Sequence, residues 1–164
     1  MAAHSVLVSL SAAILLGAVL NDIAFRTVPN WMPVTLLAFG VSIRTLDGEL
    51  LPGLLACVPI LLGAGFCWRR GWMGGGDVKL LAACGMLAPP GLSGVMLLDV
   101  ALAGGVLALL YLALGWVLVA PEAACPPGRL RAILWEERHR IHSRSPMPYA
   151  SAIAVGALLV LCNG

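Results

Sequence analysis

Three long stretches without a charged side chain constrain the fold of this 164-residue chain more than any other feature. Residues 5–20, 51–68 and 102–121 are uncharged and mostly apolar. Each approaches the roughly 20 residues that an α-helix needs to cross a bilayer core. Hydrophobic residues make up 60% of the chain and charged residues 11%, which is too little polar surface for a soluble domain. The sequence therefore predicts an all-α, polytopic membrane protein.

Turn formers and charges divide the chain into candidate membrane spans. Six segments have the required apolar character, at about 5–22, 31–46, 51–68, 78–90, 93–120 and 148–162. The length allows one bundle of six transmembrane helices and no separate soluble domain, so residues 1–164 are expected to form a single integral-membrane domain. No basic region precedes the first segment and no small-residue cleavage site follows it, so it is interpreted as a retained span.

The basic residues predict the orientation of this bundle. Nine of the ten Lys and Arg residues fall on one side of the six-span arrangement, and Arg44 alone falls on the other. The positive-inside rule then places the loops at 23–30, 69–77 and 121–147 in the cytoplasm and both termini outside. Within the longest loop, apolar residues at 129–142 share one helical face. That pattern fits either a helix lying on the membrane surface or a plain solvated loop.

Three aspartates touch the predicted spans, and each needs a reason because ionisable groups at membrane depth are costly. Asp22 closes the first span and Asp77 opens the fourth, both on the cytoplasmic side, whereas Asp99 lies nearer the outer face and is expected to bond within the bundle. Only Asp22 and Asp77 share a depth. Two adjacent carboxyls keep one proton between them, so one can act as a base and the other as an acid. The alternative is that each merely caps its helix.

The neighbours of these two aspartates strengthen the catalytic interpretation. Asp77 ends the run Gly74-Gly75-Gly76-Asp77, and glycines at a span boundary permit close approach of backbone and positive φ angles. A flexible hinge without catalysis is the alternative account of these glycines. Asp22 and Arg26 are four residues apart and could pair on one helical face, and Asn30 belongs to a turn before the second span.

Together these segments resemble a known family. Asp-x-x-x-Arg-x-x-Pro-Asn at 22–30 and Gly-x-Gly-Asp-Val-Lys at 74–79 are similar to the two motifs of the prepilin peptidases, membrane aspartyl proteases of the GxGD type. Pro148-Tyr149-Ala150 resembles the Pro-Tyr-Gly that opens the family's last span, with Ala150 as a departure that could alter local packing and is not expected to alter the chemistry. The chain has no CxxC motif and no room for the methyltransferase insert of the longer members, so it is most similar to the short peptidases of tight-adherence, or Flp-type, pili.

The resemblance implies a function and a set of site residues. Asp22 and Asp77 would be catalytic, with Gly74, Gly76, Arg26, Asn30 and Lys79 as active-site support, and no cofactor or metal is expected. The implied activity is cleavage of the basic leader from type IV or Flp-type prepilins at the cytoplasmic boundary of a bacterial inner membrane. The expected partners are the prepilin, the lipid bilayer and the pilus-assembly machinery, and no nucleic acid.

A non-enzymatic alternative remains open from the residues alone. A small transporter subunit or a pilus-assembly scaffold would also place aspartates at membrane depth, and there they would bind a proton or a cation. Cleavage of a peptide bond by the purified protein separates the two interpretations.

Overall fold

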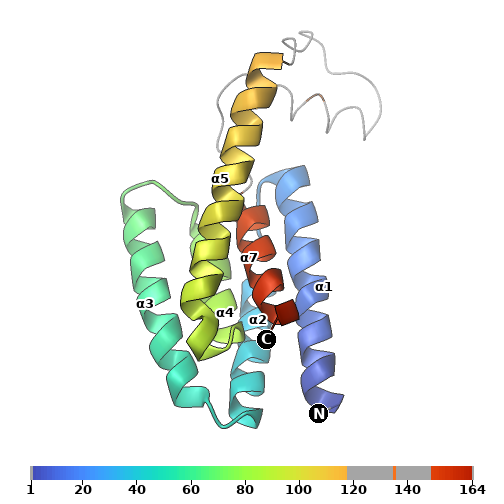
Figure 1. The fold of residues 1–164 in the computed structure, drawn as a ribbon, viewed down its shortest axis with the longest axis vertical. Helices are drawn as coiled ribbons and strands as arrows, with labels where there is room; N and C mark the ends of the chain where they lie inside the picture. The colour runs from blue at the N-terminus through green and yellow to red at the C-terminus, as the bar shows by residue number, and fades with distance from the viewer. Residues whose placement is uncertain (1, 118–134, 136–148, 164) are drawn as a thin grey trace. The chain divides into compact units, whose positions relative to one another are not determined.

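The computed structural model describes residues 2–117, 135 and 149–163, and among these residues it contains only helices and their connections (Figure 1). The prediction of an all-α fold is confirmed. The segment 129–142 lies outside the described residues apart from Trp135. The described α-helices are α1 (Ala2–Phe25), α2 (Trp31–Leu46), α3 (Leu50–Arg69), α4 (Gly75–Leu87), α5 (Ser93–Val117) and α7 (Tyr149–Asn163), and the 3₁₀-helix η1 (Pro90–Leu92) precedes α5.

The helices differ in their capacity to cross a membrane. Helices α1 and α3, and the segment Pro90–Trp116, are long and apolar enough to do so, while α2 and α7 are shorter apolar helices. Helix α4 has 13 residues, about 20 Å at 1.5 Å per residue, and falls short of a bilayer core of roughly 30 Å. Nine of its residues are buried, so α4 is surrounded by protein. The chain is a polytopic helical membrane protein in which the fourth predicted span is an internal helix.

The chain divides into two compact units, and the division falls inside α5. The first unit takes in Met1–Ala103 and Pro148–Gly164, and the second takes in Gly104–Met147. All the site residues that the sequence predicts lie in the first unit. A single functional domain over residues 1–164 stays a prediction.

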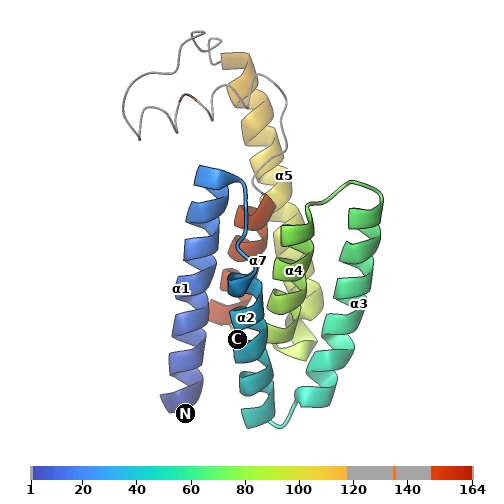
Figure 2. The same cartoon turned by 180° about the vertical axis from the view of Figure 1, so that it is seen from behind.

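Helix α4 is the centre of the first unit. It packs between α2 and α3, as Figure 2 shows, and it also contacts α7, while α1 packs against α2 and α7. Glycines allow the closest of these approaches. A Cβ added to Gly40 of α2 would lie 3.0 Å from the Leu87 backbone nitrogen, and one added to Gly156 of α7 would lie 2.7 Å from the Val100 backbone nitrogen. Small residues at helix contacts let backbones approach closely, which is how membrane helices gain packing energy without a hydrophobic driving force.

Local sequence signals end the helices. At the ends of α2 and α3 the chain turns through Gly48 and Gly71, each with φ of 73°, and the backbone hydrogen bonds Glu49 N–H to Arg44 C=O and Trp72 N–H to Cys67 C=O close the two turns. Helix α4 ends three residues earlier than predicted. The residue after it, Ala88, precedes a proline and is extended, because proline disfavours the helical conformation in the residue before it.

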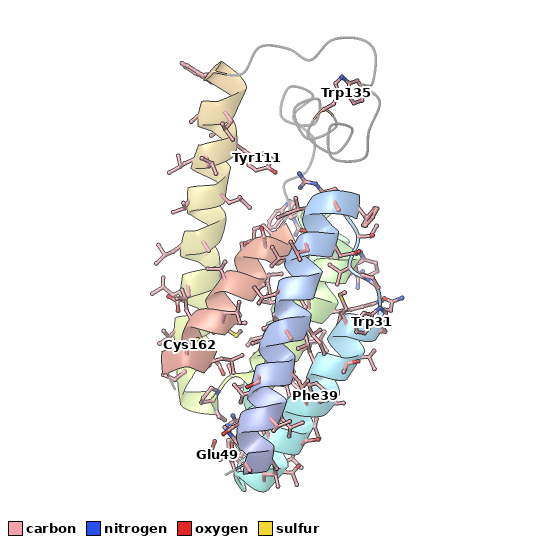
Figure 3. All side chains as sticks on the ribbon, turned by 90° about the vertical axis from the view of Figure 1, so that its right-hand side faces the viewer. Trp31, Phe39, Glu49, Tyr111, Trp135 and Cys162 are labelled. Carbon is pink, nitrogen blue, oxygen red and sulfur yellow. The ribbon has the colours of Figure 1, made fainter. Side chains whose placement is uncertain are left out.

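The end of the first unit where α2 passes into α3 contains a buried cation. Arg44 is only 4% exposed, and its guanidinium lies 3.0 Å from the Glu49 carboxylate and 3.3 Å from the Asp47 carboxylate. It also donates a hydrogen bond of 3.5 Å to the backbone oxygen of Leu87, the last residue of α4. Figure 3 labels Glu49 at this end and Trp31 at the other end of α2. Arg44, the one basic residue predicted on the outer side, is therefore a buried structural residue.

Candidate active site

The two aspartate segments lie at the end of the first unit opposite the Arg44 cluster. Asp22 is in the last turn of α1, and Asp77 is in the first turn of α4. The C-terminal end of α1, the N-terminal end of α4 and the C-terminal end of α3 point the same way in Figure 2. The inference that Asp22 and Asp77 lie at a common level, drawn from the spans, agrees with this arrangement.

The two carboxyl groups are neighbours. Asp22 is 6% exposed and Asp77 is partly buried. The negative charge of Asp22 acts on the Asp77 carboxyl, whereas Asp99 is not among the groups that do so. Two carboxyls that act on one another in a partly buried site resist ionising together, so the pair favours a state that retains one proton. The structure thus brings together the two aspartates that the sequence singles out.

Asp77 also caps its own helix. Gly74 is the N-cap residue of α4, and its backbone N–H donates a hydrogen bond to the Asp77 carboxylate. A Cβ at Gly74 would lie 3.1 Å from Asp77 Oδ2, so glycine leaves room for the carboxylate to fold back. Asp77 therefore caps the N-terminus of α4, as the alternative interpretation of the sequence held. The glycines of this run do not use the positive φ that glycine permits, and the left-handed glycine of the loop is Gly71.

The end of α1 differs from its predicted form. The helix continues to Phe25, and Arg26 follows it with φ of 55°, a left-handed conformation that is uncommon for a residue with a side chain. The Arg26 backbone N–H still donates a 2.8 Å bond to the Asp22 carbonyl. Arg26 therefore lies beyond the helix instead of on one helical face with Asp22. Strained backbone of this kind costs about 1–3 kcal/mol and is concentrated at functional sites.

The two motifs contact each other directly. Lys79 Nζ donates a 2.8 Å hydrogen bond to Asn30 Oδ1, which joins the start of α4 to the loop after α1. A Cβ at Gly76 would lie 3.4 Å from the Val28 side chain, so the glycine is where that loop packs on α4. Four of the five predicted support residues, Gly74, Gly76, Asn30 and Lys79, thus take part in contacts around the pair.

Sequence reasoning missed two residues of this site. Val28 supplies the packing surface for Gly76, and the Asn21 side-chain amide donates a 2.5 Å hydrogen bond to the Thr27 carbonyl, which closes the loop after α1. No spacing rule identifies Val28. The position of Asn21 one residue before Asp22, near a helix end, is the only signal for its role.

Asp99 behaves differently from the pair. It is partly exposed on α5, and no hydrogen bond or ion pair joins it to another residue in the described part of the chain. The predicted bond within the bundle is therefore not found among these residues. No group of three or more His, Cys, Asp or Glu side chains that could hold a metal ion occurs in the described ranges either.

Comparison with known proteins decides the family. The model of the type IV leader peptidase family matches residues 9–120, more than half of the chain, and this range includes both aspartate segments. The chain belongs to the type IV leader peptidase family. The peptidase is thus a membrane protease of the prepilin-peptidase type, as its two motifs predicted. No curated protein and no solved structure matches it.

Proposed function

We propose that this peptidase is a GxGD-type aspartyl endopeptidase that removes the basic leader from Flp-type prepilins, with Asp22 and Asp77 as its catalytic pair. The observation that carries the proposal is the electrostatic coupling of a buried Asp22 to Asp77 between two motif segments that touch each other. A pair of carboxyls that share a proton supplies both an acid and a base at neutral pH.

The proposed hydrolysis uses that shared proton. The ionised carboxylate takes a proton from a water molecule as the water oxygen attacks the scissile carbonyl carbon. The protonated carboxyl donates a hydrogen bond to the carbonyl oxygen and stabilises the charge that develops there. The C–N bond then breaks, and the proton passes to the leaving amine. Water is the only co-reactant, and no covalent intermediate forms on the protein.

The support residues hold this geometry in the proposal. Lys79 and Asn30 fasten the α4 segment to the loop after α1, and Gly74 leaves space for the Asp77 carboxylate. Arg26 turns the chain out of α1 in its left-handed conformation. These residues act as positioning residues for Asp22 and Asp77.

The proposed location is the cytoplasmic boundary of the bacterial inner membrane, with both termini outside. The distribution of basic residues supports this orientation, because nine of ten lie on the predicted inner side. Reporter fusions after residues 72 and 130 are expected to read cytoplasmic, and fusions after residues 47 and 164 external. A fusion after residue 72 that reads external would remove Asp77 from the side where the leader stays.

Cleavage by the purified protein is the direct test. The full chain in detergent is incubated with a synthetic Flp-type precursor peptide, and mass spectrometry identifies the new termini. We expect one cut after the basic leader, an unmethylated new N-terminus, and no cut by the Asp22→Asn/Asp77→Asn protein. The transporter or scaffold alternative would be favoured by a folded wild-type protein that leaves every such precursor intact. That protein would also have to take up a proton or cation through the two aspartates.

A further inference from the structure

A groove between α3 and the start of α4 shares one residue, Lys79, with the candidate active site. Its volume is about 1120 Å³, and it runs beside the Asp77 segment without including Asp77 or Asp22 among its lining residues. Three basic side chains, Arg69, Arg70 and Lys79, line it. Leu61, Leu62 and Phe66 supply its apolar wall along α3.

The positive charges of the groove are not neutralised within the described part of the chain. No ion pair joins Arg69, Arg70 or Lys79 to a carboxylate there. Lys79 donates to the neutral amide oxygen of Asn30. The Arg70 guanidinium lies 4.9 Å from the centre of the Phe66 ring, a cation–π contact that holds the charge beside the apolar wall. Three cations around one hollow create a strongly positive local potential.

The apolar wall faces outward along the membrane-spanning helix α3. Leu61 and Leu62 are 45% and 68% exposed, and Trp68, at the basic end of the groove, is 57% exposed. Tryptophan is enriched at the level of lipid headgroups. The groove therefore presents cations at headgroup level and a continuous apolar surface one to two helical turns away.

We propose that this groove binds one anionic phospholipid, with its phosphate among Arg69, Arg70 and Lys79 and an acyl chain along Leu61 and Leu62. Basic pockets between membrane helices recognise acidic headgroups in this way. Charge selects this occupant over a basic leader peptide, which the three cations repel. The apolar wall selects it over free phosphate, which makes no use of that surface.

The bound lipid has a consequence that rests on the proposed function. The basic face of the peptidase repels a basic leader, whereas an acidic headgroup beside the Asp77 segment adds negative charge where the leader must approach. The lipid thus lowers the electrostatic repulsion between the basic face of the enzyme and the leader. Lipid binding itself is measured without any substrate, so it succeeds or fails independently of the peptidase assignment.

Two glycines of α3 provide a matched pair of variants. Gly65 lines the groove, Gly63 does not, and no atom of another residue outside the helix backbone lies within 4 Å of a Cβ built on either one. Gly65→Leu therefore fills the groove without a clash at Cβ, and Gly63→Leu adds the same side chain to the same helix elsewhere. Arg69→Gln/Arg70→Gln removes two charges and leaves Lys79, which belongs to the candidate active site, unchanged.

Native mass spectrometry of the full chain in detergent micelles measures the binding of phosphatidylglycerol, phosphatidylcholine and inorganic phosphate. We expect one tightly held phosphatidylglycerol, bound at least about tenfold more tightly than phosphatidylcholine. Since each basic residue near an acidic headgroup contributes about fivefold, Arg69→Gln/Arg70→Gln should weaken binding by roughly 25-fold. Gly65→Leu should also abolish the preference, and Gly63→Leu should keep it.

Four results would overturn the lipid site. The first is equal binding of the two lipids by the wild-type protein. The second is equal loss in Gly63→Leu and Gly65→Leu. The third is displacement of phosphatidylglycerol by millimolar phosphate, which would assign the groove to a free anion. The fourth is displacement by a precursor peptide with a basic leader, which would assign it to the substrate.

Discussion

The short helix α4 meets a buried charged side chain at each of its ends. At its C-terminal end, Arg44 is surrounded by the negative carboxylates of Asp47 and Glu49 and by the polar carbonyl oxygen of Leu87. At its N-terminal end, buried Asp22 acts on Asp77, a group of the same sign. Both Asp77 and Arg44 suit the helix dipole, which favours an anion at the N-terminus and a cation at the C-terminus.

The two ends of α4 differ in whether the neighbouring charge is opposite in sign, as it is around Arg44, or like in sign, as it is beside Asp77. Opposite charges around Arg44 offset the free energy of removing it from water, so that end contributes to the fold. The like charge beside Asp77 raises the free energy of ionising both carboxyls together, so that end favours a shared proton. Arrangements of this kind are concentrated at functional sites, which supports the proposed role of the pair. The comparison therefore sets a structural charge cluster beside the proposed catalytic pair.

The largest expected effect is at the end of α4 where Asp22 and Asp77 lie. Asp22→Asn and Asp77→Asn should each lower precursor cleavage by roughly 1000-fold or more, and the double variant should be no worse, because residues that act as one unit lose their effect together. Both variants should stay folded, because asparagine keeps the size of aspartate and its side-chain oxygen can still accept the Gly74 N–H hydrogen bond at position 77. Asp47→Asn, at the other end, is the control and should cleave at close to the wild-type rate. Full cleavage by either single variant would contradict the pair.

The second prediction addresses the structural end. Asp47→Asn/Glu49→Gln leaves the Arg44 guanidinium buried without its two anions and should lower the free energy of unfolding by roughly 2–4 kcal/mol, somewhat below the value for a fully buried pair because both carboxylates are partly exposed. Denaturation in detergent measures the loss. Asp99→Asn, which removes a carboxylate without an ion pair among the described residues, should change stability by less than about 0.5 kcal/mol. Equal losses in the two proteins would remove the distinction drawn for Arg44.

The third prediction compares a glycine near each end of α4. A methyl group at Gly40 would lie 3.0 Å from the backbone of Met86 and Leu87, so Gly40→Ala forces α2 and α4 apart and should lower stability by about 1–3 kcal/mol. At Gly76 the nearest atom is the Val28 Cβ at 3.4 Å, so Gly76→Ala should stay within about 0.5 kcal/mol of the wild type. Thermal unfolding of both proteins, with Gly63→Ala as the unhindered control, tests the difference. A larger loss at Gly76 would mean that the loop after α1 limits the packing of α4.

The smallest expected effect concerns the bond between the two motifs. Lys79→Met and Asn30→Ala should each reduce kcat/KM for the precursor by about three- to tenfold, because an exposed hydrogen bond contributes about 0.5–1.5 kcal/mol. The double variant should be no slower than the slower single variant. Fully additive losses in this double-mutant cycle would show that the two side chains act separately.

Much of this protein follows from local sequence patterns. Uncharged runs of membrane length predict the helices and the membrane class, because each backbone polar group in lipid must be satisfied within its own helix. The spacing Asp22–Asn30 and the run Gly74–Lys79 indicate the family and the candidate site. Each of these two signals spans nine residues or fewer. Glycine and proline mark the helix ends at 48, 71 and 89 because their backbone preferences are intrinsic.

The remaining features depend on residues that are distant in the sequence. The Asn30–Lys79 bond joins positions 49 residues apart, and the coupling of Asp22 to Asp77 requires α1 and α4 to end at the same level. The structural role of Arg44 became clear only from its hydrogen bond to Leu87 at the end of α4. Helix α4 can be as short as 13 residues because protein, not lipid, surrounds it. Helix lengths and ends are local properties, whereas these contacts depend on which faces of the helices meet. Close approaches such as that of Gly40 to Leu87 determine which faces meet, and no local pattern specifies that Gly40 will contact Leu87.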